Sequence, residues 1–348
     1  MSEPSSQKIP VTVLTGYLGA GKTTLLNRIL SENHGKKYAV IVNEFGEIGI
    51  DNDLIIGADE EVFEMNNGCV CCTVRGDLVR ILDGLMKRKG KFDAIIVETT
   101  GLADPAPVAQ TFFVDEDVQK NARLDAVVTV ADAKWLSDRL KDAPEAKNQI
   151  AFADVIVLNK TDLVSKAELA EVEARIRGIN PYAKLHRTER CKVGLSDVLE
   201  RGAFDLDRIL EIEPEFLEVG DDHDHRHDHD HHHGHDHGHS HGGLKHYHDE
   251  EMQSLSLRSD KLLDPTKFMP WLQNLVAAEG QKILRSKGIL AFTGDDDRYV
   301  FQGVHMMLEG DHQRKWKDGE ARESRLVFIG RELPEQLIRD GFESCITT

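Results

Sequence analysis

The feature that most constrains this chain is an octapeptide, GYLGAGKT, which runs from Gly16 to Thr23. It fits the phosphate-loop pattern, and an apolar run at residues 11–14 and a helix-like run at residues 24–30 flank it. This is the strand, glycine loop, helix order that the motif requires. Backbone N–H groups of such a loop surround a phosphate, and the helix N-terminus adds the positive end of its dipole. The sequence therefore predicts a nucleoside triphosphate site.

The motif assigns a role to each of its residues. Lys22 is expected to reach the β- and γ-phosphates, and the hydroxyl of Thr23 is expected to ligate Mg²⁺. Main-chain groups of the loop and of the first helical turn are expected to supply the other phosphate contacts, from Gly16, Gly19, Ala20, Gly21 and Thr24. A tight turn without a ligand is the alternative.

Length and charge narrow the class of protein. The 348 residues have room for about two domains. A formal net charge of -18 argues against a nucleic-acid partner, because Lys and Arg carry that affinity. Neither a signal peptide nor an apolar run long enough to span a membrane is visible, and the five cysteines do not form a disulfide framework. We therefore expect a cytoplasmic protein without a membrane partner.

Apolar runs predict that residues 8–214 form an α/β domain around the phosphate loop. The runs are continuous, as in a parallel sheet that helices cover on both faces, and they lie at residues 38–42, 94–97, 126–130 and 154–158. Residues 215–251 contain almost no apolar side chain and are expected to form a disordered, His- and Asp-rich linker.

Residues 252–348 are expected to form a small α+β domain. The predicted elements are a helix at 265–278, strands at 288–292, 298–308 and 325–329, and a last helix that Pro334 opens. His305 is expected to be a half-buried strand residue rather than a ligand. Trp271, Trp316 and Phe328 are either core residues or part of a surface that faces a client.

The tetrapeptide Asn-Lys-Thr-Asp at residues 159–162 directly follows an apolar run. Ligands of open α/β sheets bind at the carboxyl ends of strands, so Asn159, Lys160 and Asp162 are expected at the nucleotide base. The Asp162 carboxylate can accept hydrogen bonds from the N1–H and the 2-amino group of guanine. Adenine lacks this pair of donors, so the sequence predicts GTP.

Glu98 and Gly101 belong to a Glu-Thr-Thr-Gly sequence that ends another apolar run. Glu98 is placed to hold Mg²⁺ through water or to orient the attacking water, and Gly101 lets the backbone approach the γ-phosphate. A solvated glutamate at a strand end is the alternative. No arginine finger can be assigned, so Lys22, Thr23 and Glu98 predict a GTPase with slow intrinsic turnover.

Three cysteines lie together in the sequence Cys-Val-Cys-Cys at residues 69–72. In a reducing compartment such clusters are more often metal ligands or redox groups than bridges. We expect Cys69 and Cys71 to be thiolate ligands and Cys72 to be a third ligand or a structural residue. Glu44 is one choice for the fourth position of a zinc site. Buried thiols and a thiol redox switch are the alternatives.

Thirteen of the 17 histidines lie within residues 223–248, where they alternate with Asp and Gly. Imidazoles beside carboxylates suit zinc, and also cobalt, nickel or copper. The ligand candidates are His227, His229, His231, His233 and His235. We expect the segment to be a weak, multi-site antenna that feeds the cysteine site. A purification tag is the alternative, but tags lie at chain ends and do not alternate with Asp.

The phosphate loop, the Cys-x-Cys-Cys site and the Glu-Thr-Thr-Gly strand occur in an order that resembles the CobW-type metallochaperone GTPases of the G3E group. The sequence VNEFGEIGID at residues 42–51 adds to this resemblance, which covers nearly the whole chain. The resemblance implies that the three cysteines bind a transition metal passed to client proteins. It places Glu44 and Asp51 in a switch region as candidate metal ligands, and makes residues 191–193 a candidate for the base-side loop.

Together these features predict a GTP-hydrolysing metallochaperone that uses GTP and Mg²⁺ and transfers Zn²⁺ to a client apo-metalloprotein. One alternative is delivery of cobalt or iron, for cobalamin synthesis or a nitrile-hydratase-type enzyme, because thiolates and imidazoles also bind Co²⁺. A metal buffer with a vestigial GTPase and a GTPase that senses redox state are two more. The sequence leaves the client and the oligomeric state open, a homo-oligomer included.

Overall fold

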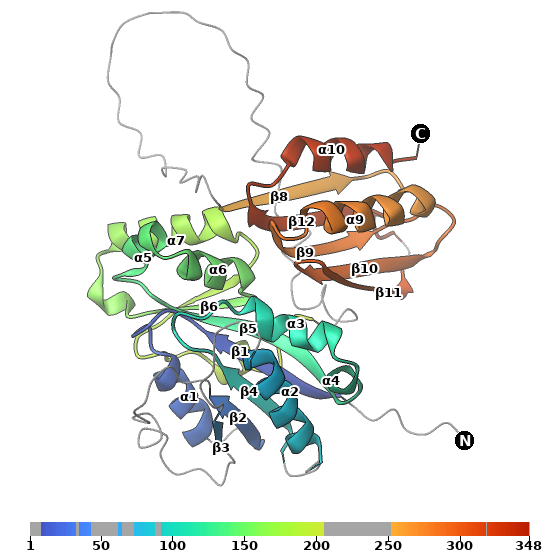
Figure 1. Cartoon of the computed structure of the whole chain (residues 1–348). Helices are drawn as coiled ribbons and strands as arrows, with labels where there is room; N and C mark the ends of the chain where they lie inside the picture. The colour runs from blue at the N-terminus through green and yellow to red at the C-terminus, as the bar shows by residue number, and fades with distance from the viewer. Residues whose placement is uncertain are drawn as a thin grey trace, which may run out of the picture.

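The computed structural model describes two sheets that pack against each other through helices (Figure 1). The described residues are 8–32, 35–42, 62–64, 73–87, 92–204, 252–317 and 319–347. The predicted pairing of a helix-flanked parallel sheet with a small α+β domain is confirmed. The predicted domain limits at residues 214 and 251, with the histidine-rich segment between them, lie outside the described residues.

The first sheet has seven strands in this part of the chain, in the order β3-β2-β4-β1-β5-β6-β7, and all its pairs are parallel. Its strands are β1 (Ile9–Thr15), β2 (Tyr38–Val42), β3 (Val62–Glu64), β4 (Ala94–Glu98), β5 (Ala122–Asp132), β6 (Val155–Asn159) and β7 (Lys184–Arg187). The five predicted strands are confirmed. The short β3 and the largely polar β7 were not predicted, because neither contains a long apolar run.

Helices flank this sheet and bury both faces of its central strands. They are α1 (Lys22–Ser31), α2 (Thr73–Met86), α3 (Ala106–Val114), α4 (Glu116–Asn121), α5 (Leu136–Asp142), α6 (Pro144–Phe152) and α7 (Lys166–Ile179). Because the strands are parallel, their carboxyl ends meet at a single edge. The loops that follow β1, β4 and β6 therefore lie side by side there.

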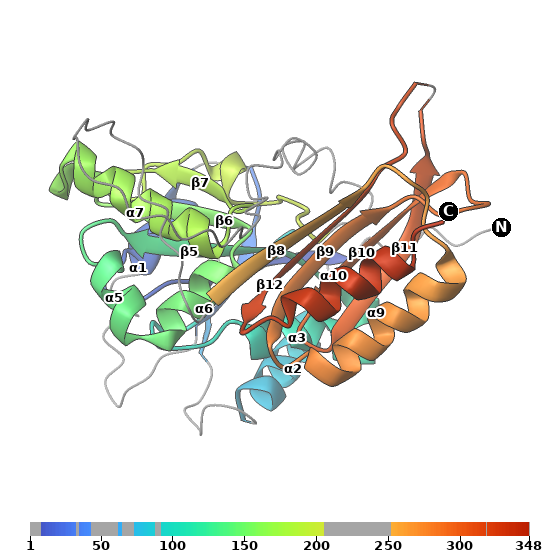
Figure 2. The same ribbon diagram turned by 90° about the horizontal axis from the view of Figure 1, so that it is seen from above.

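The second sheet is antiparallel, in the order β11-β10-β9-β12-β8. Its strands are β8 (Met252–Ser259), β9 (Ile283–Leu290), β10 (Asp297–Val304), β11 (Met307–Lys315) and β12 (Ser324–Arg331). The helices α9 (Pro265–Glu279) and α10 (Glu335–Ser344) cover its outer face (Figure 2). Both helices were predicted. None of the described helices is long and apolar enough to cross a membrane.

Two strand predictions in this domain need correction. The single strand predicted at residues 298–308 is a hairpin, in which Val304 pairs with Met307 and the chain turns at His305, whose φ is 52°. His305 is thus a turn residue and not a strand residue. The strand predicted to begin at residue 288 begins at Ile283 instead. The prediction missed this start because buried charged residues interrupt the apolar pattern of β9.

The aromatic residues left open between core and surface are at least partly buried. Phe328 is fully buried under the two helices, and Trp271 packs on Phe268 there with ring centroids 5.2 Å apart. Trp316 is partly buried, and the guanidinium carbon of Arg298 lies 5.5 Å from its ring centroid. Packing therefore accounts for all three side chains.

The inner face of the second sheet packs on the first domain through α3, α6 and α7. Asp154, buried between α6 and β6, accepts a hydrogen bond from the Val127 N–H at 2.8 Å and pairs with Arg285 and with Lys287 at 3.1 Å. Burial alone would raise the pKa of Asp154, but the charges of Arg285 and Lys287 hold this pKa below its ordinary value. The carboxylate therefore stays ionised inside the domain contact.

We expect Asp154→Ala to lower the free energy of unfolding by about 3 to 5 kcal/mol at pH 7, because it leaves two buried cations without their anion. Urea unfolding curves measure the change. Since the folded pKa is depressed, the contribution of Asp154 is complete above the unfolded aspartate pKa, near ~4, and is lost only as the pH falls below it.

The control is Asp117→Ala, which removes the exposed i,i+3 pair with Lys120 and should cost about 0.5 kcal/mol or less. Equal effects of the two substitutions would contradict the role given to Asp154.

Candidate nucleotide site

The loop between β1 and α1 has a backbone that only glycine allows at two of its positions. Gly16 has a φ of 140°, and a Cβ there would lie 2.2 Å from the carbonyl oxygen of Val130. Gly21 has a φ of 120°, and a Cβ there would lie 2.6 Å from the side-chain nitrogen of Asn159. The glycines of the motif therefore let the loop pack tightly on β5 and on the end of β6.

Helix α1 begins at Lys22 with Gly21 as its N-cap residue. Glycine has no side chain to accept hydrogen bonds from the N–H groups of the first turn. These N–H groups point out of the helix end and can therefore bind an anion. The Lys22 Nζ donates to the carbonyl oxygen of Gly16 at 2.8 Å. This bond holds the ammonium group over the loop that the sequence assigns to phosphates.

The end of β4 is joined to the same loop. Glu98, the last residue of β4, is buried and lies in register with Leu14 of β1. The Thr99 N–H then donates to the Leu14 carbonyl oxygen at 2.9 Å. A Cβ on Gly101 would lie 2.6 Å from the backbone nitrogen of Leu18, so residue 101 touches the phosphate loop directly. The structure thus brings Glu98, Gly101 and Lys22 to one edge of the sheet.

Asn159, the last residue of β6, and Lys160, the next residue, hold the outside of the phosphate loop. The Asn159 side chain donates to the Ala20 carbonyl oxygen at 2.9 Å, and the Lys160 Nζ donates to the Gly19 carbonyl oxygen at 2.7 Å. Lys160 also pairs with Asp132, at the end of β5, at 2.6 Å. Asp162 is exposed beyond them. These contacts join three strand ends around the loop.

The segment at residues 191–193 lies against Asn159. The Cys191 N–H donates to the Asn159 side-chain oxygen at 2.8 Å, and Arg28 of α1 donates to the carbonyl oxygens of Cys191 and Val193. Cys191 is fully buried, and burial raises the pKa of its thiol to about 11. Arg28 was not singled out from the sequence, because a lone arginine on a helix gives no signal of this contact.

Helix α6 links residues 101–104 to the second domain. The Gln149 side chain donates to the carbonyl oxygens of Gly101 and Ala103, each at 3.1 Å. Its neighbour Asn148 donates to Asp104 and accepts from Arg331 of β12, each at 2.7 Å. Sequence reasoning missed these amides, since nothing in the local pattern distinguishes them from solvated helix residues.

The candidate metal ligands and the antenna belong to parts of the chain that the structure does not describe. Cys69, Cys71, Cys72, Glu44, Asp51 and the histidines at 227, 229, 231, 233 and 235 all lie outside the described residues. Within the described residues, no group of three or more His, Cys, Asp or Glu side chains could hold a metal ion. However, β2 ends at Val42 and β3 at Glu64, so the chain enters both ligand-bearing segments from the carboxyl edge.

This fold and this arrangement of loops define a P-loop nucleotide-binding protein. Residues 10–187 match the CobW/HypB/UreG nucleotide-binding domain, and residues 252–346 match the cobalamin synthesis protein cobW C-terminal domain. The chain belongs to the CobW family.

Proteins similar to this chain carry names that bear on its function. The zinc chaperone YjiA of Escherichia coli is 34% identical over 339 residues, which cover 96% of this chain and 98% of YjiA. The zinc-regulated GTPase metalloprotein activator 1 of Schizosaccharomyces pombe is 35% identical, with coverage of 93% and 83%. The crystal structure of Zn(II)-bound YjiA GTPase from E. coli superposes with a TM-score of 0.74 at 31% identity, over 98% of this chain and all of that one.

We expect the Cys191 thiol to react with iodoacetamide at least about 100-fold more slowly in the folded protein than in urea at pH 8, because a pKa of about 11 leaves few thiolates. Peptide mass spectrometry measures the rate for this residue alone. The folded rate should keep rising above pH 9, whereas the rate in urea should level off near the ordinary thiol pKa of ~8.5. Equal rates in both states would contradict the burial of the Cys191 thiol.

Proposed function

We propose that this protein hydrolyses GTP and couples the nucleotide cycle to the transfer of Zn²⁺ to a client metalloprotein. The observation that carries the proposal is the meeting of three loops at one sheet edge: the phosphate loop, the segment after Glu98, and the pair Asn159 and Lys160. The names of the relatives, a zinc chaperone and a zinc-regulated GTPase metalloprotein activator, support the same activity.

In this proposal GTP lies along the carboxyl edge of the parallel sheet. The N–H groups of the loop and of the first turn of α1 bind the phosphates, and Lys22 neutralises the β- and γ-phosphates. Thr23 holds Mg²⁺, which offsets the negative charge that develops on the phosphates. Glu98 holds that ion through water or orients the attacking water. Because Glu98 is buried at the end of β4, its carboxylate is held in one position more firmly than a solvated carboxylate would be.

At the other end of the nucleotide, Asp162 reads guanine. The side chains of Asn159 and Lys160 donate hydrogen bonds to carbonyl oxygens of the phosphate loop. The next carboxylate in the sequence, that of Asp162, is therefore the one that faces the base in this proposal. We also propose residues 191–193 as the base-side loop, because Arg28 and Asn159 fix the backbone there. Specificity for guanine then follows from two donors that adenine lacks.

Zinc is the proposed cargo, and Cys69, Cys71 and Cys72 are its proposed ligands. The cysteines follow β3 and directly precede α2, which begins at Thr73, while Glu44 and Asp51 follow β2. Val42, the last residue of β2, lies in register with Glu98. The chain therefore passes the proposed γ-phosphate position just before it reaches Glu44 and Asp51. That route supports coupling between nucleotide and metal. A reducing compartment keeps thiolates available, which supports a cytoplasmic location.

We expect Asp162→Asn to weaken GTP binding by roughly 100-fold, because the amide cannot accept hydrogen bonds from both guanine donors. The same substitution should strengthen binding of XTP, whose carbonyl at position 2 can accept from the new amide. Calorimetric titration with both nucleotides measures the change. Asp83→Asn, at an exposed carboxylate on α2, is the control and should leave both affinities unchanged. A variant that keeps its preference for GTP would contradict the role of Asp162.

We expect a single tight Zn²⁺ site that disappears in Cys69→Ser/Cys71→Ser and strengthens when a non-hydrolysable GTP analogue and Mg²⁺ are present. Competition of the reduced protein with a chromophoric chelator measures this affinity, and a parallel titration with Co²⁺ compares the metals. Linkage requires the metal to tighten nucleotide binding by the same factor. Weak sites alone, indifferent to the nucleotide and to the serine changes, would instead describe a metal buffer.

A further inference from the structure

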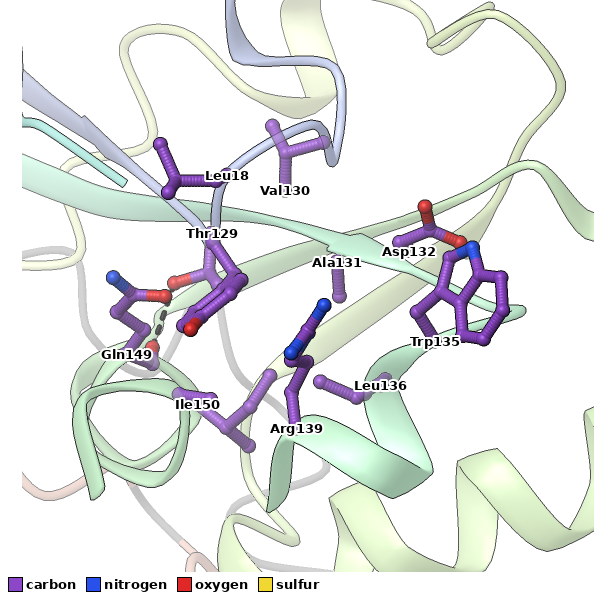
Figure 3. A pocket seen from close by; sticks show the side chains of 12 residues that line it. Leu18, Thr129, Val130, Ala131, Asp132, Trp135, Leu136, Arg139, Gln149 and Ile150 are labelled. Carbon is purple, nitrogen blue, oxygen red and sulfur yellow. Dashed lines mark hydrogen bonds between the residues drawn. The ribbon is translucent and has the colours of Figure 1, made fainter. Parts of the chain in front are cut away.

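A cavity of about 150 Å³ lies beside the phosphate loop, between that loop and the helices α5 and α6 (Figure 3). Tyr17 and Leu18 of the loop form one wall, residues 129–132 at the end of β5 form another, and Leu136 and Ile150 close it from the helices. A cavity of this volume can accept one apolar group about the size of a benzene ring.

Large apolar side chains are exposed at the rim of this cavity. Leu18 is 61% exposed and Trp135 is 51% exposed, although most large apolar side chains in the described part of the chain are buried. Leu102, which is 49% exposed, follows the glycine that packs on Leu18. Clustered exposed apolar side chains beside a cavity mark an interaction surface rather than scattered surface residues.

Two exposed cations also lie at the rim. The Arg139 guanidinium carbon lies 5.1 Å from the ring centroid of Tyr17, and the Lys134 Nζ lies 5.4 Å from that of Trp135. In the described part of the chain, neither cation has a carboxylate within ion-pair distance. The carboxylate that lines the cavity, Asp132, is paired with Lys160. Figure 3 shows the Arg139 side chain between Leu136 and Ile150, and Arg139 lines the cavity.

We propose that this cavity is a docking site for a short acidic segment of a partner protein. One aromatic or branched aliphatic side chain of the segment enters the cavity, and a neighbouring carboxylate pairs with Arg139. The exposed cations and the apolar walls together select this chemistry, since each alone would accept a much wider range of ligands. Tryptophan, tyrosine and arginine at the rim are also the residue types that dominate binding energy at protein interfaces.

A bound segment would contact the nucleotide site through its wall. Tyr17 and Leu18 belong to the phosphate loop, and Gln149, which also lines the cavity, donates to the carbonyl oxygens of Gly101 and Ala103. The Thr129 hydroxyl in turn donates to the Gln149 carbonyl oxygen at 2.7 Å. A docked segment therefore touches Leu18 and Gln149, which in turn contact the residues that follow Glu98. The docking proposal needs neither GTP hydrolysis nor a metal, so it stands or falls independently of the proposed function.

The test uses three capped peptides without nucleotide or metal: acetyl-Glu-Phe-Glu-amide, acetyl-Glu-Ala-Glu-amide and acetyl-Lys-Phe-Lys-amide. Calorimetry and tryptophan fluorescence follow their binding to the full chain. We expect saturable binding of one Glu-Phe-Glu peptide per chain, at least tenfold tighter than either of the others. Arg139→Glu should weaken that binding at least tenfold, and Trp135→Ala should weaken it and remove most of the fluorescence change.

The matched control is Arg80→Glu, at an exposed arginine that pairs with Asp77 on α2, a helix that does not line the cavity. It should bind the peptide as the unchanged chain does, and circular dichroism verifies that each variant is folded. Equal binding of all three peptides, or unchanged binding by Arg139→Glu, would overturn the proposal. So would light scattering in which Trp135→Ala converts a dimer to a monomer, because the cavity would then be covered by a second copy of the chain.

Discussion

The buried carboxylate of Asp154 is the contact on which the arrangement of the two sheets depends. One oxygen accepts the Val127 N–H within the parallel sheet, and the other meets two cations that reach across from β9. Arg285 also donates to the Phe152 carbonyl oxygen at 2.6 Å and lies over the ring of Phe204, 4.3 Å from its centroid. Three buried charges are tolerable only because each is paired, so this contact fixes how the two domains meet.

The same contact positions the nucleotide site, because β6 runs directly from it. Asp154 precedes the first residue of β6, and Asn159, the last residue, hydrogen-bonds to the phosphate loop and to the segment around Cys191. The five buried residues of β6 therefore connect the domain contact to the phosphate loop. Since every residue of β6 is buried, the strand cannot shift without disturbing both ends.

The sequence predicted those parts of the fold and site that depend on local pattern. The phosphate loop and the five apolar strands were predicted from residues that are neighbours in the sequence. The CobW family was predicted from short motifs of the same kind. The contacts of Arg28 and Gln149 depend on tertiary packing and leave no local signal. The predicted start of β9 was wrong because Arg285 and Lys287 resemble solvated residues in the sequence. Only the fold shows that both pair with the buried Asp154. The hairpin at His305 was missed because it lacks the Asn-Gly or Asp-Gly pair that usually marks such turns. The assignments of Asp162 and the cysteines stay predictions.

Helix α6 places a mechanical limit on the segment that follows Glu98. Gln149, which is 1% exposed, binds the backbone of residues 101 and 103, and Asn148 binds Asp104. Moving that segment alone would leave buried amide groups without partners, at about 1 to 3 kcal/mol for each group. Moving it together with α6 would instead disturb the contacts of Arg331 and Arg285 with the same helix. A rearrangement near the proposed γ-phosphate position therefore changes either a buried hydrogen bond within the first domain or the contact with the second.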